Sequence, residues 1–210
     1  MASGLIHICV AKEINKYLKR NEEQILLGSI APDIAKLINI SRDKTHFIDE
    51  KKDIPNIEKF LKKYKNNLNN DFIMGYYIHL YTDYLWFSFF IPNLLEKDKL
   101  IKLNNKKIKY AEDKLIEYVY NDYSALNKQL IEQYNIDLSF FKITPPKIEN
   151  IIEEIPLNKL NILIEKQNSL INESKKNENI LFDNNLINSF IEFSVNDILA
   201  NIDNLNNKKD

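Results

Sequence analysis

The segment from Phe72 to Ile91, FIMGYYIHLYTDYLWFSFFI, is the most apolar and aromatic stretch of the chain, and it limits what the chain can fold into. A helix of this length reaches about 30 Å, which is enough to cross a bilayer. However, an aspartate at the centre of a bilayer costs about 2.5 to 3.5 kcal/mol, and Asp83 lies inside the segment. We therefore expect a buried central helix at about residues 71–91 and no transmembrane segment.

His79 and Asp83 are four residues apart in this segment, so a helix places both side chains on one face. Two interpretations are open. Both side chains can be hydrogen-bonded core residues, or both can belong to a metal or catalytic site. A buried carboxylate is costly unless it has a charged partner or a metal, which favours the second interpretation.

Residues that favour tight turns are scarce, since the chain of 210 residues contains three glycines and six prolines. Leu, Ile, Lys, Glu and Asn dominate instead, which is typical of packed helices. Hydrophobic residues make up 44% of the chain, enough to build a core. We expect an all-α, single-domain, multi-helix bundle over residues 1–210, with metal-site helices in 1–134 and packing helices in 135–210.

The spacing of apolar residues, together with capping residues and prolines, indicates where these helices begin and end. A polar loop is expected at residues 41–53 and a turn near residues 175–185. We expect helices at residues 3–19, 22–30, 55–68, 71–91, 93–102, 105–134, 148–154, 157–174 and a last one that includes 186–199.

Charge and cysteine content restrict the partners and the compartment. The net charge of −1 gives no argument for nucleic-acid binding. A single cysteine, Cys9, excludes an intramolecular disulfide and suits a reducing compartment. The first residues, MASGLIHICVAKE, lack the pattern of a secretory signal. We expect a cytoplasmic protein, and these features do not determine its oligomeric state.

Three further residues are candidate ligands. His7 falls on the apolar face of the first expected helix, where a lone histidine is usually a core residue. Asp33 follows Pro32 at a helix break, where it can cap the next turn or present a ligand. His46 lies in the polar loop, where it has no packing role, so a ligand and a surface histidine are equally plausible.

Asp122 interrupts an otherwise apolar seam of the helix expected at residues 105–134, and it is therefore a further candidate ligand. Arg42 and Lys44, in the same loop as His46, supply positive charge that can bind a phosphate, which is a weaker signal.

The candidate ligands use every histidine of the chain: His7, Asp33, His46, His79, Asp83 and Asp122. Mixed imidazole and carboxylate ligands suit zinc first, with iron and manganese as alternatives. A His-x-x-x-Asp pair can give both side chains to one ion, or its carboxylate can bridge two ions. Such an ion lowers the pKa of its water ligand to about 7 and polarises a phosphoryl oxygen. We therefore expect one or two divalent ions.

Four segments, in order, resemble the zinc-dependent phospholipase C family and the related single-strand nucleases: SGLIHICVAKEI, LLGSIAPDI, THF and GYYIHLYTDYLW. They span about the first 90 residues. Members of the family are all-α proteins that hydrolyse phosphoesters with a cluster of metal ions. The resemblance implies that His7, Asp33, His46, His79 and Asp83 bind metal.

The chain departs from this family in two ways. It has no N-terminal tryptophan, whose amino group is a metal ligand in the secreted members, and no histidine follows His79, where the family has later ligands. A three-metal site is therefore not expected. Asp122 would fill part of the gap and leave a centre of one or two ions that is richer in oxygen ligands.

Three functional hypotheses follow. The first is a metal-dependent hydrolase of a small-molecule or lipid phosphoester, in which metal-activated water attacks and Asp33 or Asp83 serves as bridging ligand or base. The second is an HD-domain-like phosphohydrolase, which needs an adjacent His-Asp pair that the chain lacks. The third is a non-catalytic helical protein that binds metal for stability or sensing; metal analysis and hydrolysis assays separate it from the others.

Overall fold

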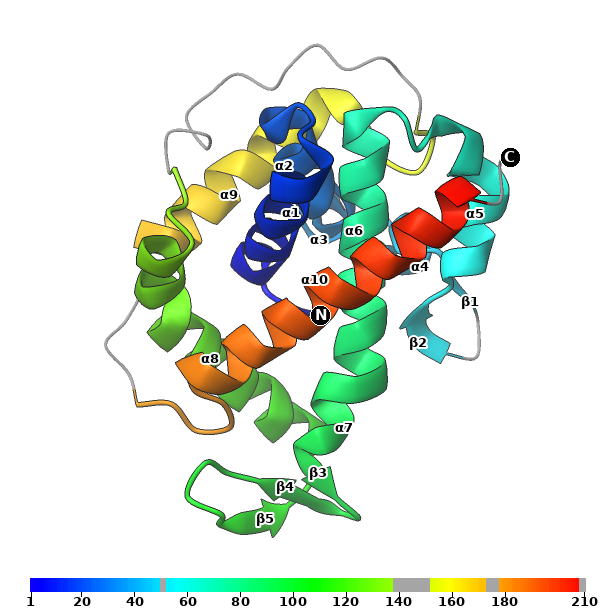
Figure 1. Cartoon of the computed structure of the whole chain (residues 1–210). Coiled ribbons are helices and arrows are strands. Elements are labelled where there is room, and N and C mark those ends of the chain that lie inside the picture. Colours follow the sequence, from blue (N-terminus) through cyan, green and yellow to red (C-terminus); the bar gives the residue numbers. More distant parts are fainter. Residues whose placement is uncertain (50–51, 138–151, 173–177, 208–210) are drawn as a thin grey trace.

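The computed structural model confirms a mostly helical fold. Figure 1 shows α6 (Asp71–Leu85) running through the middle of the molecule, with α1 (Gly4–Leu18) and α2 (Glu22–Ile30) beside it and α10 (Asn184–Asn207) crossing it. The structure describes residues 1–49, 52–137, 152–172 and 178–207.

The first two helices begin at the residues that the sequence predicts. The Ser3 side chain accepts a hydrogen bond from the Ile6 N–H, and the Asn21 side chain accepts one from the Gln24 N–H. Each cap satisfies an N–H group that has no partner inside the helix. Both helices then pack against α6, and runs of consecutive residues, Leu5–Ala11 in α1 and Ile25–Ile30 in α2, are buried.

The chain after α2 turns sharply at Pro32 through a 3-10 turn, η1 (Ala31–Ile34), and two short helices, α3 (Ala35–Ile38) and α4 (Arg42–Thr45). His46 follows directly. The expectation that His46 lies in a solvated loop is wrong, because its side chain is only 1% exposed. The Tyr76 hydroxyl of α6 donates to the Thr45 carbonyl and helps to hold this segment in the core.

A two-stranded antiparallel hairpin, β1 (Ile48–Asp49) and β2 (Lys52–Pro55), leads into α5 (Ile57–Tyr64) and the 3-10 turn η2 (Lys65–Asn67). The Asn70 side chain then caps α6 by accepting from two N–H groups of its first turn. The helix expected at residues 55–68 is therefore divided, while the central helix begins where it was predicted.

The central helix continues past Leu85 through a π-helical turn, η3 (Trp86–Phe90), into α7 (Ile91–Asn93). Pro92 explains the change of pitch, because a proline has no N–H for the helix ladder and its ring clashes with the carbonyl four residues earlier. Pro92 thus widens the helix, whereas the sequence predicted that it closes the helix.

The short helix expected at residues 93–102 is wrong. This region forms a three-stranded antiparallel sheet of β3 (Leu95–Glu96), β4 (Lys99–Ile101) and β5 (Lys107–Lys109). The turns contain Lys97 and Asn105 in left-handed conformations, which the polar composition did not reveal.

The second half of the described chain is helical again. The helix expected at residues 105–134 begins later, because β5 takes its first residues. Residues 152–154 are not helical, and the remainder of the helix expected at 148–154 lies outside the described residues, as do residues 173–177 near the expected turn. The elements are α8 (Glu112–Gln133), the 3-10 turn η5 (Leu157–Lys159), α9 (Leu160–Asn172) and α10.

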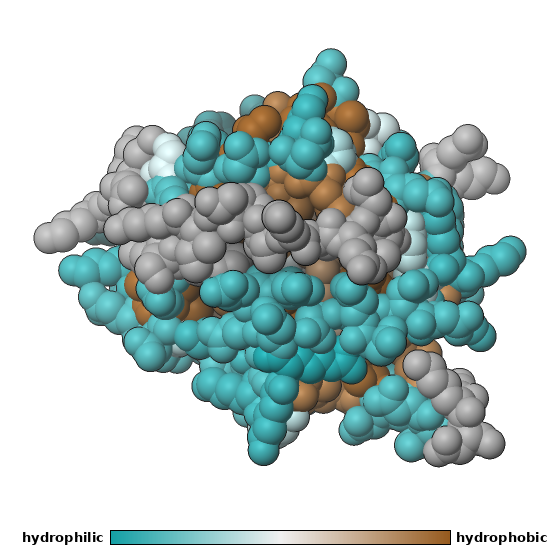
Figure 2. All heavy atoms as spheres, turned by 90° about the horizontal axis from the view of Figure 1, so that it is seen from above, coloured by the Kyte–Doolittle hydropathy of each residue, from teal (hydrophilic) through white to brown (hydrophobic). Residues whose placement is uncertain are grey.

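The face shown in Figure 2 is largely hydrophilic, with hydrophobic side chains visible in limited patches. Among the described residues, no helix has both the length and the apolar character needed to cross a membrane.

Two glycines permit the closest helix contact in the described structure. A Cβ atom on Gly28 would collide with the Phe72 carbonyl oxygen, and a Cβ atom on Gly75 would collide with the Ile25 carbonyl oxygen. Backbone atoms cannot move aside as a side chain can. The separation of α2 and α6 therefore requires glycine at both positions.

We predict that Gly75→Ala destabilises the protein by about 1 to 3 kcal/mol or more, because the added methyl group overpacks a backbone contact. The intrinsic helix preference for alanine, about 1 kcal/mol, acts in the opposite direction. Urea unfolding measures the difference. Gly4→Ala is the control, since the Cβ there meets only the end of the flexible Gln167 side chain. Equal stability of Gly75→Ala and wild type would contradict the prediction.

Candidate metal centre

The structure brings five of the six predicted ligands together. His7 comes from α1, Asp33 from η1, His46 from the end of α4, and His79 with Asp83 from α6. Their ligand atoms form two groups, each within 4.8 Å: His7, His79 and Asp83, and Asp33, His46 and His79. Four of the five side chains are at most 1% exposed, and Asp33 is 11% exposed.

The hydrogen bonds of His79 identify its protonated nitrogen. Nδ1 lies 2.7 Å from the Ser29 carbonyl oxygen, which can only accept, so Nδ1 carries the proton. Burial lowers the pKa of the imidazole well below its usual value, and the ring is neutral. Its Nε2 atom is therefore an unprotonated acceptor.

His46 is oriented in the same way by its neighbour. The Thr45 hydroxyl lies 3.2 Å from the Arg42 carbonyl and 2.9 Å from His46 Nδ1; when it donates to the carbonyl, it accepts from Nδ1, and we adopt this tautomer. Burial lowers the pKa of His46 to about 3. Nε2 of this ring is also an acceptor without a proton.

These two acceptors face each other, with 3.2 Å between His46 Nε2 and His79 Nε2. Two lone pairs at this distance repel unless a cation lies between them. Two Zn–N bonds of about 2.0 to 2.1 Å at a tetrahedral angle separate the nitrogens by about 3.3 Å. The donor set present thus fits a metal ion, and the facing lone pairs are the observation that indicates it.

Asp83 lies between the two groups. Its Oδ1 accepts from the Ala2 N–H at 2.9 Å and lies 3.4 Å from His7 Nε2. Its Oδ2 lies 3.7 Å from His46 Nε2 and 3.9 Å from His79 Nε2, with no hydrogen bond. Burial alone raises the pKa of Asp83, but His7 and the nearby positive charges outweigh it and hold the pKa well below its usual value.

His7 completes the cluster as the third imidazole. Its ring stacks on the His79 ring, with centroids 3.8 Å apart and an interplanar angle of 18°. Both of its ring nitrogens are buried and neither makes a hydrogen bond. The contact between its Nε2 and Asp83 Oδ1, 3.4 Å apart, and the stacking on His79 link His7 to the other members of the cluster.

Asp33 is the most accessible member of the cluster. Its Oδ1 has no hydrogen-bond partner and lies 3.8 Å from His46 Nε2. Burial raises the pKa of Asp33 above its usual value, although the carboxylate keeps some exposure to a cavity. A carboxylate with these properties can ligate an ion or accept a proton.

The two candidates for phosphate binding, Arg42 and Lys44, lie in different environments. Arg42 Nη2 is buried 3.6 Å from Asp83 Oδ2, so Arg42 belongs to the cluster. Lys44 is exposed and makes no hydrogen bond or ion pair within the described chain. The cluster therefore combines the carboxylates of Asp33 and Asp83 with the guanidinium of Arg42 and the neutral imidazoles of His46 and His79.

Asp122 does not join the cluster, which corrects the expectation for this residue. Its oxygens accept from the backbone N–H groups of Ile180, Leu181 and Phe182 at 2.8, 2.7 and 3.0 Å. It breaks the apolar seam of α8 because it binds the chain segment that precedes α10. Its role is structural.

Sequence reasoning missed several groups that orient the cluster. The Ser29 carbonyl and the Thr45 hydroxyl fix the imidazoles, and no sequence pattern marks a carbonyl for that role. The start of the chain was also missed: the Ala2 N–H binds Asp83, and burial lowers the pKa of the Met1 amino group to about 6. The capping role of Ser3 indicated only where α1 begins.

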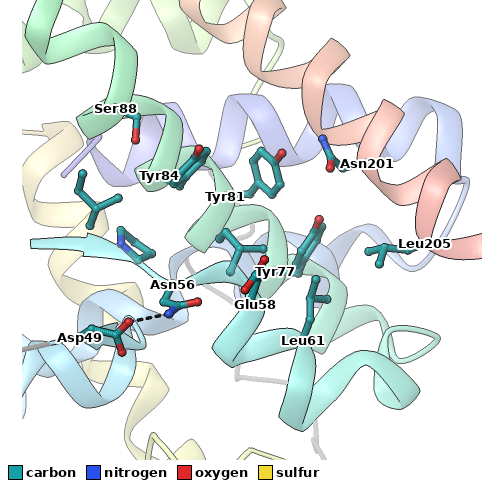
Figure 3. Close-up of a pocket in the computed structure, with 13 residues that line it drawn as sticks. Asp49, Asn56, Glu58, Leu61, Tyr77, Tyr81, Tyr84, Ser88, Asn201 and Leu205 are labelled. Atoms are coloured by element: carbon teal, nitrogen blue, oxygen red, sulfur yellow. Dashed lines mark hydrogen bonds between the residues drawn. The ribbon is translucent and has the colours of Figure 1, made fainter. Parts of the chain in front are cut away.

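The described structure has a cavity beside the cluster and a separate cleft along α6. A cavity of about 650 Å³ borders Asp33 and the first residues of the chain. A larger cleft of about 1100 Å³ is lined by Tyr77, Tyr81 and Tyr84, on the face of α6 opposite His79 (Figure 3). None of the residues that line the larger cleft belongs to the His/Asp groups, so the smaller cavity is the one that serves the cluster.

Comparisons with known proteins add no identification: no protein-family model, no curated protein and no solved structure matches the chain.

We predict that the stability of the metal-free protein falls as the pH falls from about 6.5 toward 3. The unfolded chain takes up protons near pH 6.5, whereas His46 and His79 have lowered pKa values and stay neutral when folded. Urea unfolding with a chelator at pH 7.5, 6.0 and 5.0 measures this. His46→Gln should flatten the dependence, and an unchanged slope in that variant would refute the assignment.

Asp122→Asn should lower stability by about 1.5 to 3 kcal/mol, since hydrogen bonds to a charged group are lost and an amide N–H₂ faces a backbone donor. Its metal content should equal that of wild type. Chemical unfolding and elemental analysis give the two values, with Asp113→Asn on the exposed face of the same helix as control. Loss of metal without loss of stability would restore Asp122 as a ligand.

Proposed function

We propose that the protein is a metal-dependent hydrolase of a phosphoester, with His7, Asp33, His46, His79 and Asp83 as ligands of one or two divalent ions. The facing Nε2 atoms of His46 and His79, 3.2 Å apart and buried, are the observation that carries this proposal. Zinc fits the donor set best, with manganese and iron as alternatives.

The number of ions follows from how the two groups overlap. His79 belongs to both, but its Nδ1 is bound to Ser29, so Nε2 can ligate a single ion. A single ion would be bound by ligands from both groups. In a two-ion site, Asp83 could serve both ions, since its Oδ1 lies near His7 and its Oδ2 lies near His46 and His79.

A divalent ion in this position supplies a Lewis acid and a water of lowered pKa. The chain supplies the orientation: Ser29 and Thr45 hold the imidazole nitrogens toward the site, and the Ala2 N–H holds Asp83. Asp33, whose pKa is raised by burial, is placed to accept a proton from water that arrives through the cavity. Arg42 contributes positive charge next to the developing phosphoryl charge.

The substrate class remains a phosphoester, either of a small molecule or of a lipid. The compartment that we propose is the cytoplasm. Support comes from Cys9, whose thiol is fully buried and whose pKa burial raises, so that the thiol is kept protonated and unreactive.

A non-catalytic metal site is the second candidate. The observation that favours it is the burial of His7, His46, His79 and Asp83, each at most 1% exposed, since structural sites are closed. The exposure of Asp33 to a cavity favours catalysis instead, because a catalytic ion needs an accessible position. Activity separates the two candidates, whereas metal content alone does not.

We expect purified protein to contain stoichiometric metal and, when loaded with zinc, manganese or iron, to hydrolyse bis-p-nitrophenyl phosphate. His79→Ala should lose the metal and lower kcat/KM by at least about 100-fold, since removal of a ligand exceeds the 10- to 100-fold effect of its hydrogen-bond partners. Lys44→Met, at an exposed position outside the cluster, is the control.

Three outcomes are distinct. Turnover that His79→Ala abolishes supports a hydrolase. Bound metal with chelator-sensitive thermal stability and no turnover supports the structural site. No bound metal and no turnover, with His79→Ala behaving as wild type, refutes both.

A further inference from the structure

The cavity beside Asp33 is the accessible side of the His/Asp cluster. The other four members of the cluster are sealed in the core, and only Asp33 is both a candidate ligand and part of a cavity wall. A molecule that reaches the cluster from solvent therefore approaches it along this cavity.

The walls of the cavity come from parts of the chain that are far apart in sequence. The first turn of α1 and the segment from η1 to α3 form one side, and α8 with α9 form the other. The helices after residue 111 contain no histidine; the sequence suggested a metal ligand, Asp122, in the first of them and a packing role for those after residue 134. They supply the wall opposite the cluster.

Two amide side chains in this wall have no partner. Asn127 of α8 is 8% exposed and Gln167 of α9 is 7% exposed, and both line the cavity. Neither side chain makes a hydrogen bond within the described part of the chain. Gly4 lacks a Cβ atom that would contact the Gln167 amide, so the amide can lie against the start of α1.

Polar atoms of the two amides stay open to the cavity, where they have no protein partner and can bind a ligand in place of water. Their orientation toward a cavity is explained if a ligand completes their hydrogen bonds. Each amide offers a donor beside an acceptor. The complementary ligand therefore carries a donor and an acceptor side by side, as a diol or an amide does.

The charges around the cavity indicate the other part of the ligand. Lys36 lies one helical turn after Asp33, and Lys166 lies on the opposite wall. The N-terminal end of the 15-residue helix α1, which carries partial positive charge, also borders the cavity. Glu117 is the one lining acid besides Asp33. This balance favours an anionic group near Asp33 and Lys36.

We propose that this cavity binds the substrate of the metal centre and that Asn127 and Gln167 are its specificity-determining residues. The substrate class is a phosphate ester whose alcohol part carries adjacent hydrogen-bond donors and acceptors. Its phosphoryl group lies at Asp33 and Lys36, and its alcohol part lies at the two amides. The proposal rests on the proposed function for the position of the phosphoryl group.

Isothermal titration calorimetry tests the recognition without relying on turnover. The probes are phenyl phosphate, which has no donor–acceptor pair, glycerol 1-phosphate, which has a diol, and 4-acetamidophenyl phosphate, which has an amide. The variants are Asn127→Leu, Gln167→Met and Lys36→Met. The control is Asn201→Leu, an asparagine in the separate tyrosine-lined cleft of Figure 3.

The diol or the amide probe should bind wild type more tightly than phenyl phosphate. Asn127→Leu and Gln167→Met should each weaken that probe about five- to tenfold, as expected for one lost hydrogen bond, and leave phenyl phosphate unchanged. Lys36→Met should weaken all three probes. Because the amides have no partner in the protein, both amide variants should keep or raise the Tm.

Equal affinities of wild type and both amide variants for all probes would overturn the inference. So would an equal loss for every probe together with a lower Tm, because that result assigns the amides a structural role. Amide-dependent binding without hydrolysis would refute the proposed function and leave the recognition site standing. If the protein hydrolyses a phosphoester and neither amide variant changes the affinity for the probes or the KM, this inference is refuted and the proposed function stands.

Discussion

The backbone contact between α2 and α6 positions the rest of the candidate site. Because Gly28 and Gly75 have no side chains, the two helices approach until carbonyl oxygens occupy the space of a methyl group. That approach brings the Ser29 carbonyl within 2.7 Å of His79 Nδ1. It also fixes where α2 ends and η1 begins, and therefore where Asp33 lies. One steric constraint thus sets both the tautomer of a central imidazole and the place of a carboxylate on another element.

The tautomers of His46 and His79 are the argument for a proposed metal site over an ordinary polar core. Two neutral histidines in a core would normally share one proton, with an N–H of one ring donating to the other. The Ser29 carbonyl holds the ring proton of His79 on the far nitrogen, and the Thr45 hydroxyl does the same for His46 when it donates to the Arg42 carbonyl. Burial also lowers the pKa values of both imidazoles, so protonation of either ring does not relieve the repulsion between the two nitrogens. A metal ion satisfies both nitrogens at once.

Helical periodicity was sufficient to predict α1, α2 and α6, and with them the placement of His7, His79 and Asp83. It failed where irregular backbone decides the outcome. His46 reaches the core through two short helices and a turn, which polar composition predicted as solvated loop. Asp122 interrupts an apolar seam as a ligand would, but its partners are N–H groups 58 to 60 residues away. A local pattern shows that a buried carboxylate needs a partner and cannot show which partner.

The two halves of the site place different demands on the chain, which accounts for their separation in sequence. Metal ligands must hold their geometry within a few tenths of an ångström, and α1, α2 and α6 provide this through backbone contacts in the core. A recognition wall needs only side chains of suitable chemistry on a stable surface, and α8 and α9 meet that lesser demand. Exchange of Asn127 or Gln167 therefore leaves the hydrogen bonds of Ser29 and Thr45 intact. In the proposed site, substrate choice could therefore change in the second half of the chain while the cluster in the first half stays the same.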